Sequence, residues 1–186
     1  QHNMLPKHQS GFRAHHSTET AVLKVISDIL GAADQGYVTL LGLLDMSAAF
    51  DTVDHGILLE RLATSFGMTG TALAWLRSFL TGRSQQVSYN GGLSTVGSIT
   101  TGVPQGSVLG PLLFLLYSAD VPLIASHHGL GIHCYADDGQ IYVFDKAVAA
   151  VGVVNKVAAC IEEIDRWMSS NRLRLNSEKT QFIWLG

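Results

Sequence analysis

The segment YVTLLGLLD, residues 37–45, places the strongest constraint on the fold. It is a short, continuous apolar run that follows a turn signal at Gly36, and this pattern is typical of a strand buried in the middle of a sheet. The run ends on Asp45, where a charge is costly unless water, a hydrogen bond or a cation meets it at the sheet edge. The alternative is an acid that caps the turn that follows. The segment therefore predicts a central strand with an acid at its end.

A second acidic position lies between the apolar segments IHCYA and QIYVF, which flank Asp137-Asp138-Gly139 and predict a tight hairpin. An Asp-Gly pair is common in such turns, so a purely structural role stays open. A purely structural role leaves the second acid unexplained, because adjacent carboxylates repel one another unless a cation neutralises them. Mg²⁺ prefers oxygen ligands of this kind and shares them with substrate phosphates. The pair needs a partner, and Asp45 is the candidate.

Apolar periodicity predicts the remaining elements. We expect an α/β domain with an antiparallel sheet that carries Asp45 and the acidic hairpin, backed by helices over 18–34, 107–118 and 147–170. Two further helices between 54 and 81, the first capped by Asp54, should lie off the main face of the sheet. A hairpin is expected to turn at Gly91–Gly92, and LRLN should pair with TQFIWL. The last long helix should bury one set of residues: Val151, Val154, Ala158, Ile161 and Ile164.

Composition narrows the class of protein. With 186 residues, 47% of them hydrophobic and 15% charged, the chain can bury a sizeable core, and one compact domain is expected. A net charge of −3 gives no sign of a basic nucleic-acid binder. The longest apolar run, Val108 to Leu116, is too short to span a membrane, so no membrane partner is expected. Cys134 and Cys160 fit no metal or disulfide pattern and indicate an intracellular protein, with nucleus and cytoplasm not distinguished.

The segment GVPQGSVLGP, residues 102–111, places two glycines and two prolines around Gln105 just before a helix. A glycine at a helix N-terminus lets a phosphate or another backbone approach closely, and free amide hydrogens there attract anions. An ordinary loop-to-helix junction is the alternative for this segment taken alone.

Four segments, in this order and at these separations, resemble the sequence blocks of a reverse transcriptase palm: LLDMSAAFDTVDH, TGVPQGSVLGPLLF, CYADDGQIY and LNSEKTQFIWLG. The similarity is greatest to the polymerases of non-LTR (LINE-type) retrotransposons, in which QSGFRAHHSTETA also has a counterpart. It extends from about Gln9 to Gly186. The resemblance implies a polymerase palm with an antiparallel, ferredoxin-like sheet over residues 1–186, in which 1–16 is a remnant of the fingers side and the thumb is absent.

The resemblance also implies catalytic and metal-binding roles. Asp45, Asp137 and Asp138 match the three catalytic aspartates, which hold two Mg²⁺ ions at the primer end, with Mn²⁺ as a possible substitute. Met46 is placed among the residues at the metals. Many relatives have a lysine where Ala48 stands, so one phosphate contact is missing here.

Other matched positions imply substrate contacts. Residues 46–49 would offer backbone amides to the triphosphate, and Phe50 would exclude a ribose 2′-hydroxyl. Gln105 and Gly106 would border the nascent base pair. Lys179 could protonate pyrophosphate, although a solvated surface lysine is an equal alternative. The substrate-binding set is thus Ser47, Ala48, Ala49, Phe50, Gln105, Gly106 and Lys179.

The function so implied is RNA-templated DNA synthesis from dNTPs on a DNA primer annealed to an RNA template, within a longer polyprotein. Fingers, thumb and an endonuclease would be supplied by that polyprotein, so this segment alone should be weak or inactive. Two alternatives stay open. One is another palm-type nucleotidyl transferase, namely an RNA-templated RNA polymerase or a nucleotidyl cyclase. The other is a domesticated palm that serves as a binding module.

Overall fold

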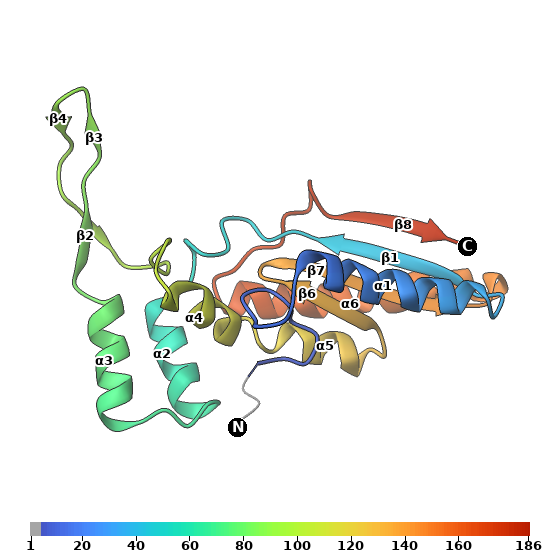
Figure 1. The fold of residues 1–186 in the computed structure, drawn as a ribbon. Helices are drawn as coiled ribbons and strands as arrows, with labels where there is room; N and C mark the ends of the chain where they lie inside the picture. Colours follow the sequence, from blue (N-terminus) through green and yellow to red (C-terminus); the bar gives the residue numbers. More distant parts are fainter. Residues whose placement is uncertain (1–4) are drawn as a thin grey trace. The chain divides into compact units, whose positions relative to one another are not determined.

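The computed structural model describes residues 5–186 and divides the chain into two compact units, where the composition predicted one compact domain. The first unit contains the chain up to Ala49 together with Ser118–Gly186. The second is the intervening Phe50–Tyr117. The first four residues of the predicted N-terminal loop lie outside the described residues. Each unit is described by itself, and Figure 1 traces the elements of both.

The first unit is built on a four-stranded antiparallel sheet in the order β6-β7-β1-β8 (Figure 1). Strand β1 has neighbours on both sides, and Thr39, Leu40 and Leu44 along it are buried. The predicted central strand and the antiparallel sheet that carries it are therefore confirmed. The four strands are β1 (Val38–Leu44), β6 (Gly131–Tyr135), β7 (Asp138–Asp145) and β8 (Gln181–Leu185).

Strand β8 corrects the predicted pairing of LRLN with TQFIWL. It pairs instead with β1, from Thr39↔Leu185 to Leu43↔Gln181. A central strand has backbone donors and acceptors along both of its edges. Strand β7 pairs with only one edge of β1, so the other edge needs a second strand. Gly42 makes room for this partner, because a Cβ atom there would lie 2.7 Å from the Phe182 ring.

Helices α1 and α6 pack on the sheet, α1 against β1, β6 and β7 and α6 against β7. Ser17 caps α1 in a reciprocal capping box with Thr20. The short helix α5, with Pro122 in its first turn, packs on β6 and α6 and was not predicted. These elements are α1 (Thr18–Ala33), α5 (Val121–His127), the 3-10 turn η1 (Ala147–Ala149) and α6 (Ala150–Ser170).

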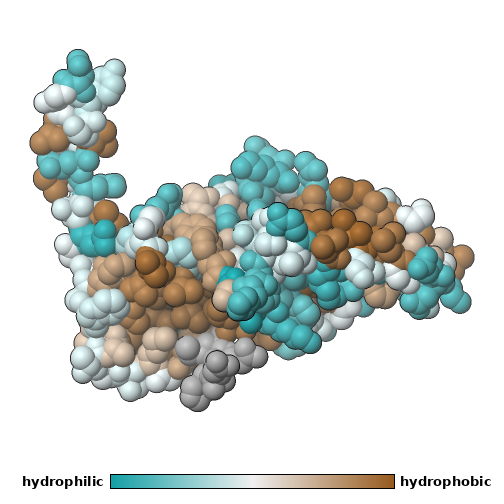
Figure 2. Space-filling model, viewed as in Figure 1, coloured by the Kyte–Doolittle hydropathy of each residue, from teal (hydrophilic) through white to brown (hydrophobic). Residues whose placement is uncertain are grey.

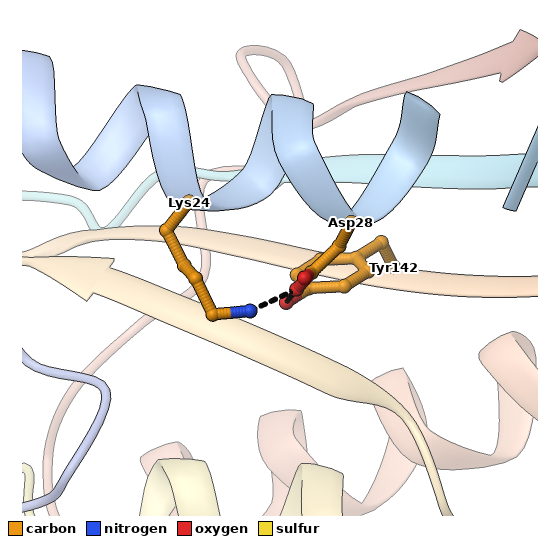
Figure 3. Close-up of polar contacts among 3 residues, drawn as sticks. All are labelled: Lys24, Asp28 and Tyr142. Atoms are coloured by element: carbon orange, nitrogen blue, oxygen red, sulfur yellow. Dashed lines mark hydrogen bonds and ion pairs between the residues drawn. The ribbon is translucent and has the colours of Figure 1, made fainter. Parts of the chain in front are cut away.

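Helix α1 is tied to the sheet by a polar cluster of Lys24, Asp28 and Tyr142 (Figure 3). The Tyr142 hydroxyl donates to the Asp28 carboxylate at 2.5 Å, and Lys24 forms an ion pair with the same carboxylate. Burial acts to raise the pKa of Asp28, but the hydrogen bonds from Lys24 and Tyr142 outweigh it and the pKa is lowered. Gly131 leaves space for the Tyr142 ring, since a Cβ there would lie 2.5 Å from a ring carbon.

The buried face of α6 differs from the predicted one. Of the five residues expected in the core only Ile164 is buried, whereas Val151 is 76% exposed and Val154 is 47% exposed. The helix carries two apolar stripes of similar strength, and packing against β7 and α5 decides between them. Exposed apolar residues also line α1, which contributes to the apolar surface in Figure 2. The buried stripe of α6 is Val153, Val157, Cys160, Ile164 and Met168.

The second unit contains three helices and a two-part β-ribbon. Asp54 caps α2 by accepting from the Ile57 amide, as predicted. The ribbon turns at Asn90–Gly91, both with positive φ, rather than at Gly91–Gly92. The elements are α2 (His55–Thr64), α3 (Gly70–Leu80), β2 (Arg83–Gln85), β3 (Ser88–Tyr89), β4 (Gly92–Leu93), β5 (Gly97–Ile99) and α4 (Leu109–Tyr117).

Helix α4 confirms the helix expected over residues 107–118, with its bounds at Leu109 and Tyr117. It begins at Leu109, because Ser107 bonds to the Pro104 carbonyl in the preceding turn and caps the helix by accepting from the Gly110 amide. It belongs to the second unit and packs against α2.

The stretch Leu109–His127 is long and apolar enough to cross a membrane by length and composition alone. A turn at residues 118–120 interrupts it, and 61% of its most apolar window is buried inside the protein. This degree of burial is typical of core helices.

The observed face of α6 predicts a difference between two valines on that helix. Val157→Ala, at a position 4% exposed, should lower the free energy of unfolding by about 2 kcal/mol, because two buried methyl groups are lost. Val154→Ala should change it by less than about 0.5 kcal/mol. Both replacements have the same effect on helix propensity, so chemical denaturation of the two variants isolates packing. Equal losses would contradict the observed face.

Candidate active site

The acidic hairpin places Asp137 and Asp138 at one end of the sheet. Tyr135 pairs with Asp138, so the two-residue turn is Ala136–Asp137, and Asp138 already belongs to β7. The sequence predicted Asp137-Asp138-Gly139 as the turn, and the structure moves it toward the N-terminus. Ala136 takes the positive φ of 56° that a glycine usually supplies. Asp137 therefore lies in the turn and Asp138 at the start of the strand.

Asp45 reaches the same end of the sheet through the register of β1 and β7. The last pair is Leu44↔Gly139, so Asp45 follows one member of that pair and Asp138 precedes the other. The Asp45 side chain is 27% exposed, yet its Oδ2 is buried and has no hydrogen-bond partner within residues 5–186. An ionised oxygen in this condition needs a nearby positive charge.

The pKa of Asp138 is raised by burial and, in part, by the two neighbouring acids. Loss of hydration raises it most, and the charges of Asp137 and Asp45 raise it further. Lys179 opposes this shift. The structure thus places the three aspartates that the sequence singled out at one end of the sheet, and Lys179 offsets only part of the effect of Asp137 and Asp45 on Asp138.

Lys179 is positioned by the segment that leads into β8. The Asn176 amide donates to the Asp45 carbonyl at 2.8 Å, and Asn176 in turn accepts from the amides of Lys179 and Thr180. The Lys179 ammonium then lies 3.8 Å from Asp45 Oδ2, while its side chain remains 71% exposed. This is longer than a hydrogen bond, so the contact is a screened ion pair. Lys179 is both a surface lysine and a neighbour of the acids.

The predicted triphosphate loop, residues 46–49, begins at the same edge. Met46 forms an antiparallel bridge with Leu175, and the Ser47 amide donates to the Arg174 carbonyl at 2.9 Å. That amide is therefore already paired, and a triphosphate would have to displace the carbonyl to use it. Ala48 has a positive φ of 47°, and Ala49 is buried.

The remaining predicted substrate residues belong to the second unit. The Val103 amide donates to the Phe50 carbonyl at 2.9 Å, and the Phe50 ring stacks on Phe114 with centroids 4.5 Å apart. Gln105 donates to the Asp51 carboxylate at 2.9 Å, and Gly106 is exposed with a φ of 78°. The structure thus joins the segments that carry Phe50 and Gln105.

A pocket of about 440 Å³ adjoins these segments within the second unit. Its lining is mostly polar and includes one positive and one negative side chain. The residues are Asp51, Arg83, Gln85, Ser98, Ile99, Thr100, Thr101, Gly102, Val103, Pro104 and Gln105.

The acidic edge offers only oxygen ligands, which suit a hard divalent cation. Within residues 5–186 no three His, Cys, Asp or Glu side chains are grouped so that they could hold a metal ion by themselves. Mg²⁺ is commonly bound by only one or two carboxylates, with water and substrate phosphate as the other ligands.

Sequence patterns did not single out Gln9. Its buried side chain is hydrogen-bonded to both backbone polar groups of Ala136, in the turn that carries Asp137. The contact joins residues 127 positions apart and leaves no periodic signal.

The family model described as "Reverse transcriptase (RNA-dependent DNA polymerase)" matches residues 1–185. Among curated proteins, the RNA-directed DNA polymerase from mobile element jockey of Drosophila melanogaster is 31% identical over 180 residues, which are 94% of this chain and 19% of that protein. The probable RNA-directed DNA polymerase from transposon X-element of the same species is 42% identical over 118 residues, 63% of this chain and 13% of that protein. The chain thus spans a fifth or less of these relatives.

Among solved structures, apo telomerase from Candida tropicalis, truncated from its C-terminal domain, superposes with a TM-score of 0.71. The alignment covers 96% of this chain and 36% of the telomerase chain at 18% sequence identity. Likeness at this identity concerns the fold, and it confirms the predicted palm-type architecture.

The raised pKa of Asp138 predicts how stability depends on pH. The pKa of Asp138 is higher in the folded protein than in the unfolded chain. Ionisation of Asp138 therefore destabilises the fold at a pH above the folded pKa, and this effect is absent at a pH below the unfolded pKa, where the group is protonated in both states. In metal-free buffer, Asp138→Asn should therefore raise the urea midpoint at pH 7, with a gain that disappears near pH 3. A loss at pH 7, or an equal gain at both pH values, would contradict the crowding of the three acids.

Proposed function

Because the chain belongs to the reverse transcriptase family, we propose that it forms the catalytic palm of an RNA-directed DNA polymerase of the non-LTR type. Its substrates would be dNTPs and a DNA primer annealed to an RNA template. The observation that carries the proposal is the position of Asp45 beside the Asp137–Asp138 hairpin, which the pairing Leu44↔Gly139 determines.

The residues at this edge fit a divalent metal. Asp45, Asp137 and Asp138 supply hard oxygen ligands, Met46 adjoins them in the chain, and the unpartnered Asp45 Oδ2 lacks a compensating charge at hydrogen-bond distance within the described residues. We assign two Mg²⁺ ions to this edge, with Mn²⁺ as a substitute. Bound there, they would activate the primer 3′-hydroxyl and stabilise the charge on the triphosphate.

The side chains around the acids have separate tasks. The three carboxylates act in their ionised form, because the protonated form is a poor ligand. Lys179 would donate a proton to the leaving pyrophosphate, a role supported by its exposed ammonium at the acidic edge, 3.8 Å from Asp45 Oδ2. In the second unit, Phe50 would contact the incoming sugar, and Gln105 and Gly106 would border the nascent base pair. The loop at 46–49 would bind the triphosphate, for which the Ser47 amide must leave the Arg174 carbonyl.

The polymerase is favoured over the alternatives. The jockey and X-element relatives are polymerases by name, and the β1–β7 register, with Asp45 next to the acidic hairpin, supports the same proposal. Neither a nucleotidyl cyclase nor a binding module has a comparable observation in its support. Since the chain spans a fifth or less of these relatives, we propose that fingers, thumb and endonuclease segments of the same polyprotein complete the activity and that the palm alone is weak or inactive.

We also propose that the protein acts inside the cell, in the nucleus or the cytoplasm. Cys134 and Cys160 are free and buried, and burial raises the pKa of Cys134 to about 12. Burial, followed by the Glu163 charge, raises the pKa of Cys160 to about 11. Such thiols are unreactive and suit a reducing compartment.

Primer extension tests the role of the acids. In a hybrid in which this chain replaces the matching segment of a longer non-LTR polymerase, Asp137→Asn should lower extension on an RNA template by about a hundredfold or more, because metal binding contributes several kcal/mol. Asp165→Asn, an exposed acid on α6, should leave it unchanged. Equal extension by the Asp137→Asn and unmodified hybrids would reject the site.

Sugar selection tests Phe50. In the same hybrid, Phe50→Ala should raise ribonucleotide incorporation relative to dNTP incorporation by roughly tenfold, because a steric block of this size is worth one to a few kcal/mol. Phe50→Tyr retains the ring and should preserve discrimination. Unchanged discrimination in Phe50→Ala would show that this ring is not the steric gate.

A further inference from the structure

Residues His8 to Gly11 run along the outer edge of β6 and reach the turn of the acidic hairpin. The Cys134 amide donates to the His8 carbonyl at 2.7 Å, and the Ser10 amide donates to the Cys134 carbonyl at 2.8 Å. Gln9 and Cys134 thereby form a parallel bridge. This pairing brings the Gln9 side chain alongside Ala136.

The Gln9 carboxamide bonds to both backbone polar groups of Ala136. Its Nε2 donates to the Ala136 carbonyl at 3.0 Å, and its Oε1 accepts from the Ala136 amide at 2.9 Å. The same oxygen accepts from the Gly11 amide at 2.8 Å, and Gln9 is only 4% exposed. Only a group that both donates and accepts can make this set, so a carboxylate or an apolar side chain cannot replace it.

Gly11 and Arg13 support the same contact. A Cβ atom on Gly11 would lie 2.3 Å from the Ala136 nitrogen, so the close approach of the two backbones requires glycine. Arg13 donates from Nη1 to the Pro6 carbonyl at 3.0 Å and to the Gln9 carbonyl at 3.1 Å. The Arg13 side chain thus bridges the two ends of the segment formed by residues 6–9.

We infer that Gln9 is a positioning residue that holds the turn of the acidic hairpin and thereby presents Asp137 to the divalent ion. Ala136 has a φ of 56°, a conformation that is unfavourable for a side chain with a Cβ and that persists only when its surroundings hold it. Gln9 supplies that support from outside the sheet. The part of this inference that concerns the ion rests on the proposed function, whereas the support of the turn does not.

The test compares Gln9→Met with Ser10→Ala in this chain. Met has a similar length and cannot make the hydrogen bonds. Ser10 is the matched control, because it is 2% exposed in the same segment and its hydroxyl bonds to the His133 ring at 2.8 Å instead of to the turn. Three quantities are measured: Mn²⁺ affinity by EPR, hydrogen exchange of the Ala136 amide by NMR, and the thermal midpoint.

We expect Gln9→Met to weaken Mn²⁺ binding and to speed Ala136 exchange, each by about tenfold or more, because both hydrogen bonds to Ala136 are lost and one buried hydrogen bond corresponds to about tenfold. Ser10→Ala should leave the Mn²⁺ affinity and the Ala136 exchange rate within about twofold of the unmodified chain. This should hold even if its thermal midpoint falls as far as that of Gln9→Met. Gly11→Ala should reproduce the two effects of Gln9→Met by displacing the turn, and it replaces Gln9→Met if that variant does not fold.

Two results would overturn the inference: unchanged Ala136 exchange and Mn²⁺ affinity in Gln9→Met, or equal changes in Ser10→Ala. A failure of the unmodified chain to bind Mn²⁺ would instead count against the proposed metal site. In that case Ala136 exchange alone decides whether Gln9 supports the turn.

Discussion

The antiparallel pairing of β1 with β7 is the contact on which the rest of the structure depends. Because the strands run in opposite directions, the carboxyl end of β1 meets the amino end of β7, and the ladder closes at Leu44↔Gly139. This register brings Asp45, more than ninety residues earlier in the chain, to the turn that carries Asp137. A slip of one residue would turn every side chain of β1 to the opposite face and break the site.

The same edge concentrates negative charge, and the fold compensates only part of it. Asp138 experiences both neighbouring carboxylates, and Asp45 has a buried oxygen whose nearest cation, within the described residues, is Lys179 at 3.8 Å. A well-paired acid would be more stable but would leave no ligand for a metal. The unfavourable electrostatics fit the proposed metal site, and the sheet, with the Gln9 side chain hydrogen-bonded to the turn, holds the acids in place.

Local signals in the sequence predicted the parts of the fold that local chemistry decides. The apolar run of β1 and the Asp54 cap appear where expected, and the acidic hairpin forms with its turn displaced toward the N-terminus, to Ala136–Asp137. The predictions for the partner of β8 and for the buried face of α6 were wrong. More than one apolar segment could pair with β8, and more than one stripe of α6 could be buried, so tertiary packing makes the choice. Gln9 was not predicted for a related reason, since its bonds to Ala136 depend on the arrangement of distant backbone segments.

The most direct test of the central claim is an anomalous-difference map from crystals of this chain soaked in Mn²⁺. Asp45 and the hairpin share one edge of the sheet, so we predict a peak in contact with the carboxylates of both Asp45 and Asp137. A peak that touches the hairpin alone, or the absence of any peak at this edge, would contradict the claim that the β1–β7 register assembles a metal-binding catalytic site.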